Sequence, residues 1–260
     1  GESNWFCYPC KVGALLCFVY FNSKYMSSAL SMANLFELAT KEESAQKPDL
    51  VVIFGNDDGN DATNFYYDKA NDIWVGCISD NPRIEYFGYL KKMCLTLHNL
   101  AQMKKGWLPI HGAFVNIYLK DGTKKGIMLM GDSGAGKSES IEALKAAAGD
   151  MIREVEVVFD DMGTIHLEDG VPYGQGTEIG AFIRLDDLDP GTPYRDMDRS
   201  IFMAPENPNS RMIQPAAPYR LLPVLSLQQP VLRQPSVLPV QVLPVLFSSS
   251  CLPKCNQTKK

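Results

Sequence analysis

The stretch of this sequence best suited to chemistry is a glycine-rich octapeptide, Gly131-Asp132-Ser133-Gly134-Ala135-Gly136-Lys137-Ser138. Its spacing is that of a P-loop, in which backbone N–H groups converge on phosphate oxygens. An apolar run precedes it and helix-forming residues follow it, so phosphates would also meet the positive end of a helix. The spacing predicts that Lys137 reaches the β- and γ-phosphates of a nucleoside triphosphate and that Ser138 binds Mg²⁺.

Two further segments carry residues suited to a metal ion. Downstream of the loop, a strand-like run over residues 154–159 ends in Asp160 and Asp161, where P-loop enzymes hold their metal. Upstream, His111 lies in an apolar run, and a charged turn at residues 120–125 predicts a β-hairpin leading into the loop. Acidic pairs on loops are usually just solvated, and a lone histidine beside a strand usually serves structure. The prediction therefore depends on the position of these residues relative to the loop.

The order of these segments resembles the kinase domain shared by phosphoenolpyruvate carboxykinase and HPr kinase/phosphorylase. LPIHGAFVN, the charged hairpin, GDSGAGKS and a strand ending in DD follow one another. In ATP-dependent carboxykinases, a Met-His-Cys-Ser-Ala-Asn segment precedes a GxSGxGKT loop and a Gly-Asp-Asp motif. The resemblance implies that Lys137 binds phosphate. It assigns the metal ion to four residues: His111, Ser138, Asp160 and Asp161.

A later segment extends the resemblance. Glu206-Asn207-Pro208-Asn209-Ser210-Arg211, followed by Pro215, is similar to the carboxykinase Glu-Asn-Thr-Arg…Tyr-Pro segment, whose arginine contacts nucleotide phosphates. The resemblance thus implies that Arg211 is a phosphate ligand and that it acts in catalysis with Lys137 and Asp161. Residues 177–180, Thr-Glu-Ile-Gly, show a shorter likeness to the carboxykinase Glu-Gly-Gly and the HPr kinase Glu-Ile-Arg-Gly segments.

Three departures from the carboxykinase pattern bear on the acceptor substrate. Ser138-Glu139 is nearer to the Gly-Lys-Ser-Glu of HPr kinases, and the connector from Lys137 to Asp160 is longer than in either branch. The sequence also lacks the Gly-Arg-Ser-Pro-x-Asp-Lys segment with which ATP-type carboxykinases grip the dicarboxylate. The resemblance implies ATP, held by residues 131–139 and Arg211, together with Mg²⁺ or Mn²⁺.

The primary interpretation is a carboxykinase-like enzyme that decarboxylates oxaloacetate, a small dicarboxylate, and phosphorylates the resulting enolate with ATP. The alternative is a serine kinase of the HPr kinase type, in which Asp160 or Asp161 would act as general base. A third interpretation is an inactive nucleotide-binding remnant.

Composition favours a globular protein of the cytoplasm. The 260 residues are 45% apolar and 21% charged, as in ordinary soluble domains. A net charge of −5 argues against a nucleic-acid or membrane-surface partner. The seven cysteines are irregularly spaced, which is typical of reduced thiols in the cytosol. The oligomeric state is left open.

The hydrophobic pattern predicts an α/β fold with a mixed, partly antiparallel sheet that carries the P-loop. Apolar spacing predicts helices at residues 26–39 and 83–104 and strands at 49–54 and 73–78. The apolar run at 5–21 is interpreted as one buried strand or as an incorrect N-terminus. A strand at 163–167 should turn at 168–170, with His166 facing solvent. We expect an N-terminal α/β region at 1–105, a P-loop nucleotide-binding domain at 106–220 and a disordered, proline-rich tail at 221–260. The abrupt start of the tail predicts a truncated or frameshifted reading frame.

Overall fold

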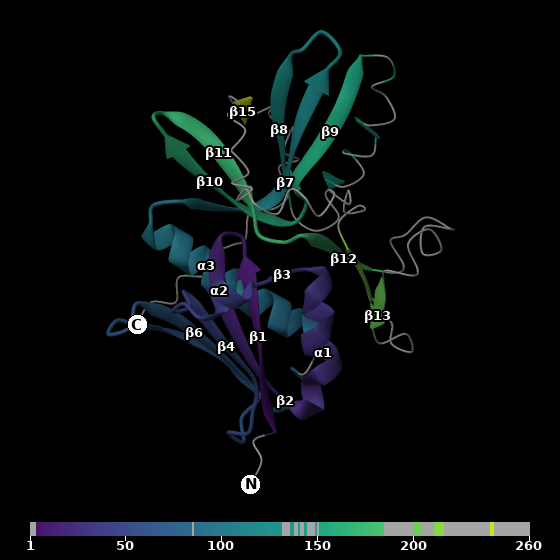
Figure 1. The fold of residues 1–260 in the computed structure, drawn as a ribbon. Coiled ribbons are helices and arrows are strands. Elements are labelled where there is room, and N and C mark those ends of the chain that lie inside the picture. The colour runs from purple at the N-terminus through teal and green to yellow at the C-terminus, as the bar shows by residue number, and fades with distance from the viewer. Residues whose placement is uncertain are drawn as a thin grey trace, which may run out of the picture.

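The computed structural model describes residues 4–84, 86–131, 136–137, 140, 143–144, 149, 151–184, 200–203, 211–215 and 240–241. These residues form an α/β structure with three sheets, mixed or antiparallel in their strand directions (Figure 1). At this level the predicted fold class is confirmed. Within these ranges no helix is long and apolar enough to span a membrane.

The first sheet is mixed and has the strand order β3-β1-β2-β4-β6-β5. Neighbours β2, β4 and β6 run parallel, while β1, β3 and β5 are antiparallel to their neighbours. The apolar run predicted near the N-terminus is in fact a hairpin of two strands, turning at Gly13 with a positive φ of 58°. The bounds are β1 Trp5–Val12, β2 Leu15–Asn22, β3 Glu37–Leu38, β4 Leu50–Asn56, β5 Thr63–Asp68 and β6 Ile73–Ser79.

Helices α1 (Met26–Ser31) and α3 (Phe87–Lys104) contribute to the main hydrophobic core beside this sheet, and α2 (Lys41–Ser44) is a single capped turn. The long helix α3 matches its prediction. The predicted helix at 26–39 is too long, because the chain passes through a 3-10 turn at Met32–Asn34 and then into β3. Leaving the helix lets Phe36 become fully buried in the core and lets Leu38 pair with β1.

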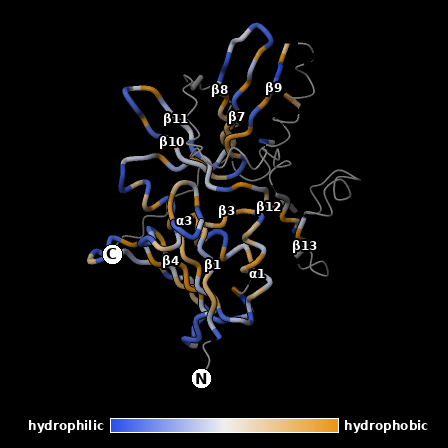
Figure 2. Tube along the Cα trace, in the orientation of Figure 1, coloured by the Kyte–Doolittle hydropathy of each residue, from blue (hydrophilic) through white to orange (hydrophobic). Residues whose placement is uncertain are grey.

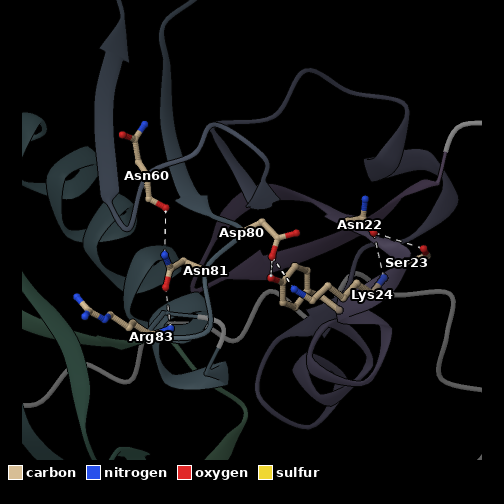
Figure 3. A network of polar contacts seen from close by, with 8 residues as sticks. Asn22, Ser23, Lys24, Asn60, Asp80, Asn81 and Arg83 are labelled. Atoms are coloured by element: carbon tan, nitrogen blue, oxygen red, sulfur yellow. Dashed lines mark hydrogen bonds and ion pairs between the residues drawn. The ribbon is translucent and has the colours of Figure 1, made fainter.

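Polar contacts join the loops at one end of the first sheet (Figure 3). The carboxylate of Asp80, just after β6, accepts hydrogen bonds from Lys24 Nζ at 2.6 Å and from the Tyr25 hydroxyl at 2.5 Å. Burial, together with the bond to Asp80, raises the pKa of Tyr25 to about 12. The Asn81 side chain links the backbones of Asn60 and Arg83. These contacts fix the ends of β2 and β6 relative to each other.

The second sheet has the order β11-β10-β7-β8-β15, with β9 also pairing to β7. Its β7–β8 hairpin is the one predicted to lead into the glycine-rich loop. The strand predicted at 163–167 is β10, and the chain turns after it near the predicted 168–170 to pair with β11. The third sheet, β12-β14-β13, carries Ile213 into the main core. The bounds are β7 Leu108–Leu119, β8 Lys124–Met130, β9 Ile152–Phe159, β10 Met162–Glu168, β11 Val171–Gly176, β12 Gly180–Arg184, β13 Ile201–Met203, β14 Arg211–Pro215 and β15 Val240–Gln241.

Helix α3 connects the two larger sheets and touches both, packing on β4 and β6 of the first and on β7 of the second (Figure 1). The predicted boundary at 105/106 falls in the short connection between α3 and β7. Of the predicted tail at 221–260, Val240 and Gln241 pair in parallel with β8, and the rest lies outside the described residues.

Candidate functional site

A change of strand partner along β7 places Asp161 beside His111. The first part of β7, up to His111, pairs with β10, whereas the part from Phe114 onward pairs with β9 on the same edge. The turn between β9 and β10 must therefore pass next to residues 112 and 113 of β7, where the strand partner changes. Gly112 N–H donates to the backbone oxygen of Asp161 at 3.0 Å, and His111 Nε2 lies 3.3 Å from Asp161 Oδ1. Two residues fifty positions apart in the chain thus meet.

Lys91 of α3 adds a positive charge to this pair. Its Nζ lies 2.9 Å from Asp161 Oδ2 and 3.1 Å from Glu178 Oε1. The side chains of Lys91 and Glu178 are 7% and 8% exposed, and that of Asp161 is 48% exposed. One buried ammonium group therefore holds two carboxylates, and the partly exposed one is also next to His111.

The sequence reasoning missed Lys91, although a signal was present. Lys91 lies four residues after Phe87 and three before Cys94, both of which are buried, so it falls on the core-facing stripe of the helix. A lysine in that position requires a partner, because an isolated ammonium group is too costly to bury.

Backbone contacts hold Glu178 in place from both sides. The preceding carbonyl, of Thr177, accepts a hydrogen bond from Gly13 N–H at 3.0 Å, and the following amide, of Ile179, donates to Leu35 O at 2.7 Å. Gly13 and Leu35 belong to the first-sheet region, so the segment that carries Glu178 is tied to it. The likeness noted at residues 177–180 thus falls on a residue of this cluster.

The charges of the cluster act on one another. Burial raises the pKa of Glu178 to about 6, even though Lys91 opposes this rise. Burial alone would lower the pKa of Lys91, but Glu178 and Asp161 outweigh it and the pKa is raised. For Asp161, burial would raise the pKa, yet Lys91, His111 and Lys137 together bring it below its usual value. Asp161 is therefore ionised at neutral pH, and Lys91 is charged.

Lys137 is close enough to Asp161 for its charge to help lower the pKa of that carboxyl group. Its Nζ donates to the backbone oxygen of Gly131 at 2.8 Å, across the glycine-rich loop. Gly136 has a positive φ of 82°, and Ser140 N–H donates to its carbonyl at 2.9 Å, as in the first turn of a helix. The other predicted loop residues, Asp132, Ser133, Gly134, Ala135, Ser138 and Glu139, lie outside the described part of the chain.

Arg211, at the start of β14, shares an aromatic neighbour with Lys91. The Arg211 guanidinium carbon lies 5.9 Å from the ring centroid of Phe182, and Lys91 Nζ lies 5.3 Å from it. Burial raises the pKa of Tyr86, while the charges of Arg211 and Lys91 oppose that rise. The ring of Tyr86 lies 6.2 Å from Phe182. Arg211 thus lies in the same neighbourhood as Lys91, although it is far from it in the sequence.

The predicted metal ligands come together only in part. His111 and Asp161 are adjacent, and Asp160 is near enough to raise the pKa of Glu178. Ser138 falls outside the described ranges, and within those ranges no three His, Cys, Asp or Glu side chains form a group able to hold a metal ion. Mg²⁺ is usually held by one or two carboxylates, with water and substrate phosphates completing its shell. Asp161 as a single carboxylate donor fits that chemistry.

The two remaining histidines have structural surroundings. His166 was predicted to face solvent, which is wrong: its side chain is 11% exposed and stacks on Trp107, with centroids 3.8 Å apart. The indole of Trp107 thus covers one face of the His166 imidazole. His98 is fully buried in α3, and burial lowers its pKa to about 4. The partners of His98 are Asn99 and Gln102, and those of His166 are Glu168, Trp107 and Tyr173, none of which belongs to the cluster around Asp161.

Comparison with models of known protein families gives no match, and a search of curated proteins finds none either.

Proposed function

We propose that this chain binds ATP with a divalent metal ion and transfers its γ-phosphoryl group in the manner of an ATP-dependent phosphoenolpyruvate carboxykinase, with oxaloacetate as the dicarboxylate substrate. The observation that carries the proposal is the contact of Asp161 with His111 and Lys91, with Lys137 near enough to help lower the pKa of Asp161. Such a mixture of ionised acid, imidazole and ammonium groups suits a polyphosphate and its metal ion.

Each side chain would have a distinct part. Lys137 would leave the Gly131 carbonyl for the β- and γ-phosphates, and Arg211 would add positive charge to the polyphosphate. Asp161 and His111 would hold Mg²⁺ or Mn²⁺, which supplies a Lewis acid for the charge that develops on the transferred group. Lys91 would keep Asp161 ionised and oriented while Glu178 fixes Lys91 from the buried side.

The ionisation of Asp161 bears on the choice of acceptor. A serine kinase of the HPr kinase type needs a carboxylate that removes a proton from the hydroxyl group. The lowered pKa of Asp161 makes it a weaker base. An enolate formed by decarboxylation needs no such base. The lowered pKa thus favours the carboxykinase-like reaction over a kinase with Asp161 as its base, and Asp160 is the base left to the kinase alternative. An inactive nucleotide-binding remnant is the outcome if neither acceptor is used.

Turnover assays test the proposal. We expect phosphoenolpyruvate formation from oxaloacetate that depends on ATP and Mn²⁺, and a fall of about a hundredfold or more in Asp161→Asn. The matched control is Asp57→Asn, an exposed acid in the loop after β4. Phosphate transfer to a serine of a small carrier protein, with no oxaloacetate reaction, would instead identify the kinase alternative. Absence of both reactions in a chain that binds ATP would contradict the enzymatic proposal.

A further inference from the structure

The first sheet has one face that the helices cover and one that they leave open. Strand side chains alternate between the faces, and the covered face is identified by its contacts. A Cβ at Gly76 of β6 would meet the side chain of Met93 in α3, and Phe54 of β4 lies in the same core as α1. The register of the parallel strands then assigns the alternate residues to the opposite side. The centre of this open face consists of six residues: Phe18, Tyr20, Val51, Ile53, Val75 and Cys77.

The open face is apolar but is not part of any hydrophobic cluster in the described part of the chain. Tyr20 is 39% exposed, Phe18, Val51, Ile53 and Cys77 are each half-buried, and Val75 between its neighbours is buried, at 8% exposed. Figure 2 shows hydrophobic residues along β4, the strand next to β2. A sheet that faced solvent on this side would show polar residues at these positions. Apolar residues on both faces are instead typical of a sheet that is buried on both sides.

The lack of charge at the centre of the open face limits which kind of partner can bind there. None of the six central residues carries a formal charge. Charged side chains appear at the β1–β3 border, where Lys11 Nζ lies 3.2 Å from Glu37 and 3.4 Å from Glu43. An apolar centre with a polar border is the anatomy of a protein–protein interface. A nucleic acid or a charged ligand would gain nothing from the centre, so the partner must be equally apolar and flat.

The size of the face fits a second copy of the same sheet. Same-face residues along a strand are about 6.7 Å apart and strands about 4.8 Å, so about twelve outward residues on five strands cover about 400 Å² in projection. Two such faces hide about 800 Å² of flat area, and more once the relief of the side chains is included. This lies below the about 1,200 Å² at which stable specific interfaces begin, in the range of weak, transient ones. Two twisted sheets also stack readily face to face, about 10 Å apart.

We propose that this chain forms a weak symmetric dimer in which the open faces of two copies stack into a β-sandwich. A two-fold axis near Ile53 brings the same residues of both copies together, because an isologous interface uses the same patch twice. The flanking Pro9 of β1 and Tyr66 of β5 lie toward its margins. The dimer is independent of the proposed phosphoryl transfer, because none of its residues belongs to the cluster around Asp161.

Sedimentation velocity between about 1 and about 100 μM tests the dimer directly. We expect the full chain to show a reversible monomer–dimer equilibrium. Tyr20→Lys and Ile53→Lys place two charges in the apolar centre, which should weaken association by about a hundredfold or more. Tyr20 is exposed in the monomer, so Tyr20→Lys should fold normally, as circular dichroism would confirm. The matched control, Leu167→Lys on the exposed side of β10, should dimerise like the unmodified chain.

Cysteine labelling separates the dimer from a cover supplied by the chain itself. Cys7 and Cys77 both lie on the open face, so maleimide should modify them rapidly in dilute protein and slowly in concentrated protein. Mass spectrometry distinguishes them from the other cysteines. A monomer at every concentration overturns the proposal, whether Cys77 reacts freely or is protected by another segment of the same chain. A dimer that survives both lysine substitutions overturns it as well.

Discussion

Replacing Lys91 by methionine tests the electrostatics of the cluster around Asp161. Methionine keeps most of the volume of the lysine stem but removes the ammonium group that lies 3.1 Å from Glu178. Removing one partner of a buried ion pair commonly costs 3–5 kcal/mol, because the other charge is left buried and unpaired. In this protein the loss of stability should be smaller near neutral pH, because Glu178 can take up a proton and so lose its unpaired charge.

The pKa of Glu178 sets the size of the effect. With a pKa of about 6 in the folded protein, protonating Glu178 at pH 7 costs about 1.4 kcal/mol, which caps its share of the loss. At pH 5 the carboxyl group is already mostly protonated, so this share is close to zero. At pH 8 the cap rises to about 2.7 kcal/mol. Asp161 is half exposed and adds at most about 1 kcal/mol at any of these pH values.

Proton linkage determines whether the destabilisation by Lys91→Met grows or shrinks with pH. In Lys91→Met the folded-state pKa of Glu178 rises further above its unfolded value, so the stability linked to its proton is present at low pH and lost as pH increases. Urea unfolding at pH 5, 7 and 8 should therefore show a destabilisation that grows with pH. Glu178→Gln in the same chain should remove that growth. Lys92→Met, the exposed neighbour, is the control and should cost less than about 0.5 kcal/mol. Equal destabilisation at pH 5 and 8 would refute the reasoning.

Three other predictions concern stability. Burial lowers the pKa of His98 to about 4, so the free energy of unfolding should fall as pH drops below 6.5, by about 2 kcal/mol at pH 5. Urea titrations of His98→Gln should no longer show this pH dependence. If the variant keeps it, another group causes it. Gly176→Ala should lower the melting temperature, because the added Cβ would lie 2.4 Å from the backbone oxygen of Val158, at a cost of about 1–3 kcal/mol. An unchanged melting temperature would show that β9 and β11 are not so closely packed. Trp107→Ala should remove about 1 kcal/mol of stacking on His166 and speed hydrogen exchange in the β10–β11 hairpin, and unchanged exchange would contradict the stack.

Local patterns predicted the elements well where one physical cause dominates. The helix at 83–104 has a continuous apolar stripe, and the charged turn at 120–125 separates two apolar runs, so α3 and the β7–β8 hairpin followed from the sequence. The helix at 26–39 was predicted too long because burial of Phe36 and pairing of β3 with β1 override the helical spacing. Tertiary pairing of this kind leaves no local signal.

The cluster itself was predictable only in part, for the same reason. The order of motifs singled out His111, Asp161 and Lys137, and spacing alone could not show that β7 changes partner between His111 and Phe114. Lys91 reads as an ordinary polar helix residue until its place on the buried stripe is noticed. Its partner Glu178 lies far along the chain, and a contact of that sequence separation depends on how the sheets are joined through α3.

The most direct measurement of the central claim is isothermal titration of ATP in the presence of Mg²⁺ into the unmodified chain and into Lys137→Ala. Lys125→Ala, an exposed lysine on β8, serves as the control. We predict that the unmodified chain and the control bind with the same affinity and that Lys137→Ala binds at least about tenfold more weakly, a loss of about 1.4 kcal/mol or more. Equal affinity in all three proteins, or no binding by the unmodified chain, would contradict the assignment of Lys137 to the phosphates.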